Sequence, residues 1–249
     1  MKLSSVFERA MIGAAIDLCP NKLNGRPRIL SDEDATSSIF KVLRTGMQWN
    51  ELSSNVNYTT VFRRFRRWVD CGVFEAAYAA TLKTYKKLHK VQYYAVDSSY
   101  VRSKRHKGFT GRNHTDRGRQ ALKLSVIVDQ LGMVHGACTH PGNRPDVTLL
   151  RDTLCSAMCS LDSVELFADR GYPSRKNSGV CSEFGLKDRI FRRKTKTCRR
   201  TNAKRVIVEH TFAWLQQYRR LLHVFERHSS SFLAFVLLAA GNRMGLFCG

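Results

Sequence analysis

Three acidic residues stand at the ends of apolar segments, and their order along the chain restricts the fold more than any other feature. Asp97 follows the apolar run at residues 93–96, and Asp169 follows the run at residues 164–168. Glu209 lies in a later segment whose apolar residues recur at helical spacing, and it stands at the edge of that apolar stripe. Two carboxylates at strand ends and a third on a later helix can meet on a mixed sheet. The pattern predicts an oxygen-ligand site for divalent metal there.

The charge of the chain favours a polyanionic partner. Lys and Arg number 42 against 20 Asp and Glu, which gives a net charge of +22. A charge of this size favours DNA or RNA through counterion release, and an anionic membrane is the alternative. The apolar run at residues 232–240 is too short to span a bilayer, and no signal-peptide or lipidation pattern occurs. We therefore expect an intracellular protein that works with DNA, in a bacterial nucleoid or a eukaryotic nucleus, with no membrane partner.

The cysteines and histidines allow a weaker interpretation as zinc ligands. Cys155 and Cys159, and His135 and His140, have tolerable ligand spacing, but no compact Cys/His quartet appears. Eight cysteines occur without the spacing of a disulfide framework, which favours reduced thiols. Packing of small apolar side chains is the simpler interpretation of the cysteine pair.

Residues 1–90 are predicted to form a helical domain that binds DNA. Ser31 and the three acids after it begin one helix, and a break near Gly46 separates it from a second helix at residues 58–69. The second helix interleaves buried aromatic residues with arginines, which is typical of a helix-turn-helix. The arginines expected to meet DNA are Arg63, Arg64, Arg66 and Arg67. A helical hairpin with a solvated basic face is the alternative.

Residues 91–249 alternate between strand and helix patterns and are expected to form the second domain. Strands are predicted at residues 93–101, 122–128, 133–139 and 164–168 and near 190–191, and helices at residues 146–158, from 174 to about 184, and around Glu209. A hairpin turn at residues 129–132 joins the second and third strands. This order predicts an α/β fold with an RNase H-like mixed five-stranded sheet and flanking helices, preceded by the helix-turn-helix domain.

Two densely cationic segments, residues 102–119 and 192–205, flank the acidic strand ends. A phosphate backbone bound near the carboxylates would have to lie against them. The residues of these segments expected to contact DNA are Arg102, Lys104, Arg105, Arg192, Arg193, Lys194, Arg199, Arg200 and Arg205, and Lys123 and Arg170 outside them are expected to contact DNA as well. Solvated loops are the alternative for both segments, and a nuclear-localisation signal is a further one for the second.

Taken in order, these motifs resemble the DDE transposases of insertion sequences, in the group named after the fifth insertion sequence. The resemblance spans most of residues 30–245. Its blocks are Ala95-Val96-Asp97-Ser98, Lys123-Leu124 to Val128-Asp129, Pro141-Gly142 with Pro145-Asp146, Ala168-Asp169-Arg170-Gly171-Tyr172, and Val208-Glu209-His210-Thr211-Phe212-Ala213-Trp214-Leu215. The Asp-Arg-Gly-Tyr block and the helix with the glutamate are specific when they occur together.

The resemblance implies an enzyme that cleaves and joins DNA strands of a mobile element by in-line phosphoryl transfer. It implies that Asp97, Asp169 and Glu209 are the catalytic and metal-binding residues, with two Mg²⁺ or Mn²⁺ ions as cofactors. It also implies double-stranded DNA partners, namely transposon ends and a target. The working unit is then a homodimer or a larger assembly on DNA.

Two positions depart from the family pattern and keep other functions open. Asn202 replaces a usual tyrosine, and Gln216 replaces a usual lysine. These positions help to place the transposon end, so their loss bears on transposition more than on metal binding. The alternatives are an impaired or co-opted transposase-derived DNA-binding protein, and a nuclease without strand transfer.

Glu209 is expected to complete the metal site, because Glu226 suits a surface ion pair and Glu183 a helix C-terminus.

Overall fold

The structure is a computed structural model that describes residues 2–20, 29–52, 57–104, 107–190 and 199–248, with only the backbone at residues 199–203. The chain divides into two units that interleave in sequence. A helical unit contains residues 1–88, 217–222 and 228–249, and an α/β unit contains residues 89–216 and 223–227. The helical unit thus takes in the C-terminal helix, which a single division at residue 90 does not describe. The functions assigned to the two domains stay predictions.

The helical unit is built around aromatic side chains. Its elements are α1 (Ser5–Leu18), α2 (Asp32–Thr45), the 3-10 turn η1 (Trp49–Glu51), α3 (Tyr58–Asp70), α4 (Val73–Leu88), η4 (Arg219–Leu221) and α8 (Ser229–Gly245). The Ser31 hydroxyl caps α2 by accepting from the Asp34 amide at 3.0 Å, and Gly46 ends that helix at φ 70°. The ring of Phe65 in α3 stacks on the ring of Phe235 in α8, with 4.7 Å between the ring centroids. None of the described helices has the length and apolar character that a membrane crossing requires.

The arginines of α3 do not form one exposed basic face. Arg64 is buried, and its guanidinium pairs with the Asp32 carboxylate in the first turn of α2. Arg66 donates to a serine hydroxyl of α8 at 2.6 Å, whereas Arg63 and Arg67 are exposed. The prediction that Arg64 faces DNA is therefore wrong. A buried guanidinium needs a carboxylate, and Asp32 supplies it.

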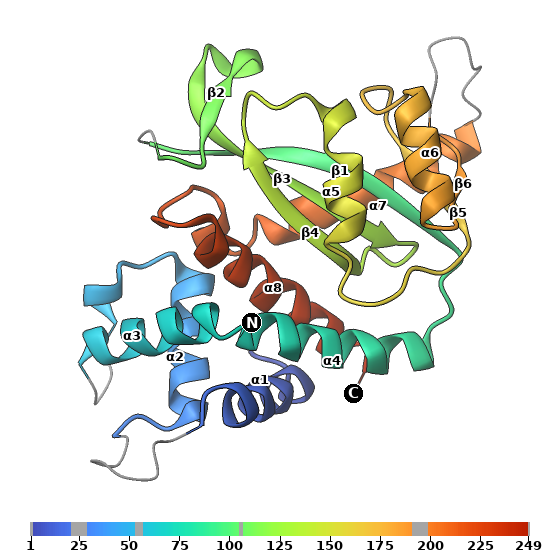
Figure 1. The fold of residues 1–249 in the computed structure, drawn as a ribbon. Helices are drawn as coiled ribbons and strands as arrows, with labels where there is room; N and C mark the ends of the chain where they lie inside the picture. The colour runs from blue at the N-terminus through green and yellow to red at the C-terminus, as the bar shows by residue number, and fades with distance from the viewer. Residues whose placement is uncertain (1, 21–28, 53–56, 105–106, 191–198, 249) are drawn as a thin grey trace. The chain divides into compact units, whose positions relative to one another are not determined.

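The α/β unit contains a mixed sheet with β1 at its centre (Figure 1). Its strands are β1 (Tyr93–Arg102), β2 (Gly111–Asn113), β3 (Arg119–Asp129), β4 (Val134–Pro141), β5 (Glu165–Ala168) and β6 (Lys187–Asp188). β1 pairs antiparallel with β3 and parallel with β5, while β4 pairs with β3 and β6 with β5. The described residues form six strands where five were expected, because the short β2 adds to β3. The last strand precedes the predicted position at residues 190–191.

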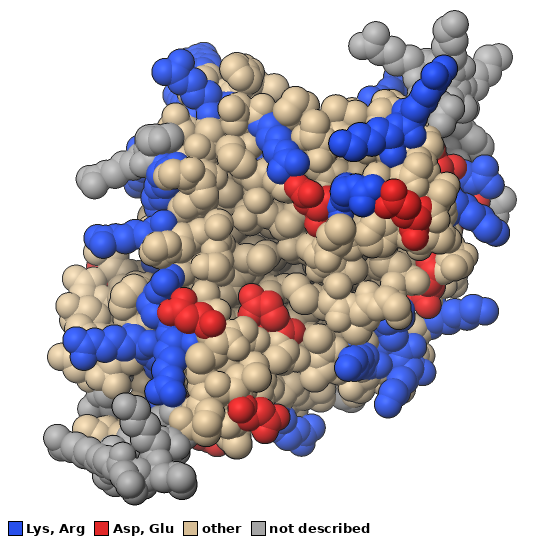
Figure 2. Space-filling model, viewed as in Figure 1, with Lys and Arg blue, Asp and Glu red and all other residues tan. Residues whose placement is uncertain are grey.

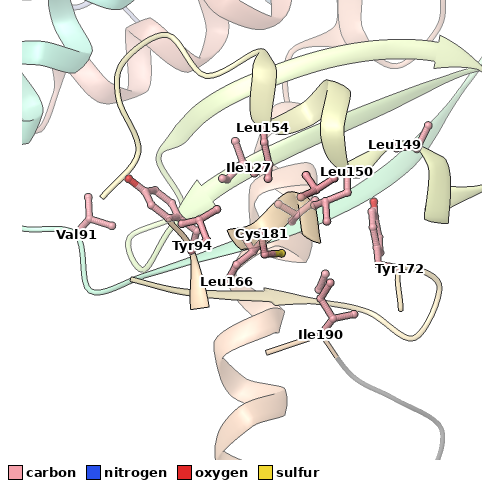
Figure 3. Packing of buried hydrophobic residues seen from close by; sticks show 14 residues of the cluster. Val91, Tyr94, Ile127, Leu149, Leu150, Leu154, Leu166, Tyr172, Cys181 and Ile190 are labelled. Atoms are coloured by element: carbon pink, nitrogen blue, oxygen red, sulfur yellow. The ribbon is translucent and has the colours of Figure 1, made fainter. Parts of the chain in front are cut away.

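Helices cover both faces of this sheet in the RNase H-like arrangement that was predicted. In Figure 1, α5 (Leu150–Cys155) and α6 (Arg175–Glu183) lie on one face and α7 (Arg199–Leu215) on the other. The predicted helix at residues 146–158 is shorter, because the 3-10 turn η3 (Asp146–Thr148) precedes α5. A buried cluster fills the space between the sheet and α5 and α6 (Figure 3). It includes Tyr94, Leu166, Leu150, Leu154 and Cys181.

The predicted hairpin between β3 and β4 is confirmed, and it also holds α7. The Asp129 carboxylate accepts from the Leu131 and Met133 amides at 2.9 and 3.0 Å, and Gly132 adopts φ 72°. The buried Thr211 hydroxyl of α7 donates to the Gly132 carbonyl at 3.1 Å. This contact fixes α7 along the sheet one half-turn from Glu209.

Candidate active site

Asp97 and Asp169 lie at the ends of neighbouring parallel strands. In the register of β1 and β5, Val96 stands opposite Ala168, so the residue that follows each of them reaches the same edge of the sheet. The side chain of Asp97 is 21% exposed and that of Asp169 is 48% exposed. The pairing therefore places one nearly enclosed and one open carboxylate side by side.

The alternation of side chains along β1 turns Asp97 toward α7. Tyr94 and Val96 belong to the core under α5 and α6, so Asp97, one residue further, points to the opposite face. α7 is held on that face by Lys204, whose ammonium lies 5.0 Å from the Tyr93 ring centroid and interacts with β5 as well. The next turn of α7 is thereby brought over the strand ends.

One guanidinium stands at the centre of the three predicted carboxylates. Arg205 of α7 places Nη1 3.8 Å from Asp97 Oδ2 and 4.0 Å from Asp169 Oδ2. Its Nη2 lies 2.9 Å from Oε1 of Glu209, four residues later on the same helix. The structure therefore gathers Asp97, Asp169 and Glu209 around Arg205, which sequence reasoning had assigned only to DNA.

Asp97 has an unusual protonation equilibrium. The pKa of its carboxyl is raised to about 6, mainly by burial and also by the neighbouring Asp169 and Asp146, while the Ser98 amide and Arg205 act to lower it. The Ser98 amide donates to Asp97 Oδ1 at 2.8 Å. A raised carboxyl pKa at the most enclosed of three acids is typical of a functional site.

The donor set suits a hard divalent cation. All three groups are carboxylates, the oxygen ligands that Mg²⁺ and Mn²⁺ prefer. Within the described residues no three His, Cys, Asp or Glu side chains stand close enough together to hold a metal as placed. The Arg205 guanidinium instead occupies the space between the acids and compensates their charge.

Lys123 is buried and is not an exposed cation. Its side chain is 3% exposed, and its ammonium donates to Asp146 Oδ1 at 2.9 Å and to the Arg144 carbonyl at 2.8 Å. The prediction of a DNA contact at Lys123 is therefore wrong. A lysine inside an apolar strand is a buried cation that requires a carboxylate partner.

The structure describes the side chains of only some of the other cations that were predicted to contact DNA. Arg102, Lys104 and Arg170 are exposed, and Arg102 also pairs with Asp116 at 3.1 Å. Arg105, Arg192, Arg193 and Lys194 lie outside the described residues, and only the backbone is described at Arg199, Arg200 and Asn202. On the face shown in Figure 2, blue Lys and Arg side chains project at many points among fewer red acids.

The structure also shows two acids in settings that the sequence patterns do not predict. Asp146 joins Ser98 and Lys123 behind Asp97, and the only sequence signal was its place in the Pro145-Asp146 motif. Glu226 is buried at 6% exposure, so the expectation of a surface ion pair there is wrong. Glu183 ends α6 as predicted and pairs with Arg151 at 2.7 Å.

The sequence also matches two family profiles that cover most of the chain. The profile described as "Transposase DDE domain" matches residues 89–241 and so includes all three carboxylates. The chain belongs to this family. Membership of a DDE transposase family implies a general dependence on divalent metal. A second profile, "Putative transposase of IS4/5 family", matches residues 11–78, which include α2 and α3.

Individual relatives are similar over part of their length. A putative transposase for insertion sequence element IS402 from Burkholderia cepacia is 32% identical over 138 residues, which are 52% of this chain and 65% of that protein. Among solved structures, a pre-cleavage Mos1 transpososome is 12% identical, with 92% of this chain and 80% of that chain covered and a TM-score of 0.31. A Mos1 transposase paired-end complex with the left transposon end is 13% identical, with 88% and 79% covered and a TM-score of 0.32.

Proposed function

We propose that the protein is a transposase that cuts DNA at the ends of a mobile element and joins those ends to a target. The observation that supports this most directly is the meeting of Asp97, Asp169 and Glu209 around Arg205, from two strand ends and one helix. The +22 charge of the chain agrees with a DNA substrate.

Asp97, Asp169 and Glu209 would hold two Mg²⁺ or Mn²⁺ ions. Such ions would supply activation of the attacking water or 3′ hydroxyl and stabilisation of the leaving oxygen. Arg205 compensates the three acids before the substrate arrives, and it turns to the phosphate backbone when DNA binds. Exposed Arg170, next to Asp169, supports the same backbone.

Two further parts of the proposal concern DNA and assembly. Exposed Arg63 and Arg67 on α3 would contact the ends of the element, with the helical unit as the reader of those ends. Two ends must be brought together, so the working unit is a homodimer or a larger assembly on DNA. The mass of the complex with paired end fragments, measured by light scattering, tests this directly; one monomer holding two ends would contradict it.

The decisive assay for this function uses DNA from both sides of the gene. Fragments with a free 3′ hydroxyl at the element's end are mixed with a supercoiled target plasmid and Mg²⁺ or Mn²⁺. A transposase gives joined products, while a nuclease without strand transfer gives only nicked or linear DNA. An impaired or co-opted DNA-binding protein binds the fragments but neither cuts nor joins DNA. Asp169→Asn is the negative control.

A further inference from the structure

A second polar cluster lies on the face of β1 opposite Glu209. Its members are Ser98 of β1, Lys123 of β3 and Asp146 at the start of η3. The Ser98 hydroxyl donates to Asp146 Oδ1 at 2.6 Å, and the Lys123 ammonium donates to the same oxygen at 2.9 Å. One carboxylate oxygen thus joins two strands of the sheet to the loop that leads into α5.

The position of this cluster follows from the alternation along β1. Asp97 points toward α7, so Ser98 points to the other face, where α5 and α6 cover the core. The side chains of Asp97 and Ser98 therefore lie on opposite faces of β1. Whatever holds Ser98 also fixes the backbone that carries Asp97.

Burial of its partner Lys123 restricts the position of Asp146, which is itself 37% exposed. The Lys123 side chain is 3% exposed, and its ammonium lies 4.7 Å from the Tyr100 ring centroid. A buried ammonium is costly without a carboxylate, so the pair restricts both side chains to one geometry. The Lys123 ammonium also donates to the Arg144 carbonyl at 2.8 Å, which holds the loop before η3.

Asp146 also meets the turn that follows Asp169. A Cβ atom placed on Gly171 would lie 3.3 Å from Asp146 Oδ2 and 3.4 Å from its Cβ. A side chain at position 171 would therefore press against Asp146, and glycine keeps this approach free of crowding. Asp146 thus hydrogen-bonds the residue that follows Asp97 and lies close to the turn that follows Asp169.

We infer that Asp146, held by Lys123, is a positioning residue that fixes the strand ends carrying Asp97 and Asp169. This rests on the proposed function of those two carboxylates. Asp146 acts from behind the sheet, through Ser98 on one side and through the Gly171 turn on the other. Carboxylates that hold Mg²⁺ need near-ideal geometry, so a looser pair of strand ends weakens metal binding and catalysis.

The test separates positioning from folding with four variants. These are Asp146→Ala, Lys123→Met, the double variant, and Asp152→Ala, a control acid of similar exposure that pairs with Arg144. Three quantities are measured: the rate of plasmid nicking against Mg²⁺ and Mn²⁺ concentration, the midpoint of thermal unfolding without metal, and the rise of that midpoint on adding Mn²⁺. The last quantity does not depend on activity.

Asp146→Ala should lower the nicking rate by about 10- to 100-fold, more with Mg²⁺ than with Mn²⁺, and lower the unfolding midpoint. The double variant should recover the midpoint, because the unpaired ammonium is gone, while its nicking rate stays within about threefold of Asp146→Ala. Asp152→Ala should nick at the wild-type rate. If the nicking rate returns together with stability, or if Asp146→Ala cuts as fast as Asp152→Ala, the inference is overturned.

A wild-type protein that nicks no DNA would refute the proposed function. The positioning role of Asp146 would then be tested by the thermal unfolding measurement alone. In that case a Mn²⁺-induced rise of the midpoint that is present in the wild type and at least halved in the double variant supports the positioning role. An equal rise in both proteins, or none in either, overturns it.

Discussion

Replacing Asp97 with Asn is expected to stabilise the metal-free protein at neutral pH. Burial raises the pKa of the Asp97 carboxyl to about 6 from an ordinary value of 3.8, with attraction by Arg205 already included. The difference is about two pKa units, and each unit corresponds to about 1.4 kcal/mol. Because the folded pKa is the higher one, the protonated group favours folding, and this contribution is lost as pH rises from about 4 through about 6. At pH 7 the ionised carboxylate therefore costs the fold about 3 kcal/mol.

The assay is thermal unfolding of the wild type and Asp97→Asn in a chelating buffer. At pH 7.5 the variant should unfold roughly 5–10 °C higher, and its advantage should shrink by about half at pH 5. Adding Mn²⁺ should stabilise the wild type and leave the variant nearly unchanged, because the metal offsets the charge of Asp97. Asp152→Asn, outside the site, serves as the control. A variant less stable than the wild type at pH 7.5, or an advantage independent of pH, would refute the reasoning.

Three other outcomes follow from the structure. Arg63→Gln with Arg67→Gln should weaken binding to fragments of the element's ends while the free energy of unfolding stays the same. Arg64→Gln should instead lower the free energy of unfolding by roughly 3–5 kcal/mol, because it breaks the buried ion pair with Asp32; calorimetry and gel-shift titration distinguish them, and reversed effects would contradict the assignment. DNA affinity should fall steeply between low and moderate salt, as anisotropy can measure, and a flat response would refute phosphate contacts. Gly132→Ala should lower the free energy of unfolding by more than about 1 kcal/mol, because φ at Gly132 is 72° and an added Cβ would lie 3.0 Å from the Thr211 hydroxyl oxygen; an unchanged free energy of unfolding would refute this strain.

That Asp97 and Asp169 follow the ends of neighbouring strands could be predicted from sequence, because strand ends are marked by simple patterns. Asp97 and Asp169 each end an apolar run, and parallel pairing of two such strands brings their ends together. Glu209 could be chosen over Glu183 because it borders an apolar stripe, whereas Glu183 precedes a glycine that ends a helix. Local periodicity carries this information without any knowledge of long-range contacts.

The errors came where a cation's environment depends on distant residues. Arg64 and Lys123 were assigned to DNA because charged side chains are usually exposed. Their partners, Asp32 and Asp146, lie 32 and 23 residues away in the sequence. No local pattern pairs such residues, although a lysine inside the apolar strand β3 was a sign of burial. The placement of α8 in the helical unit could not be predicted for the same reason, because the sequence of an apolar helix does not show which elements it packs against.

We propose that Glu209 completes a metal-dependent DNA-cutting site with Asp97 and Asp169. Plasmid nicking by the wild type, Glu209→Gln and Glu183→Gln, measured in Mg²⁺ and in Mn²⁺, tests this proposal. Glu183 is the matched control, because it is an exposed glutamate of the same unit that is also paired with an arginine. We expect the nicking rate to fall by more than about a hundredfold for Glu209→Gln and to stay normal for Glu183→Gln. Near-normal cutting by Glu209→Gln would contradict it.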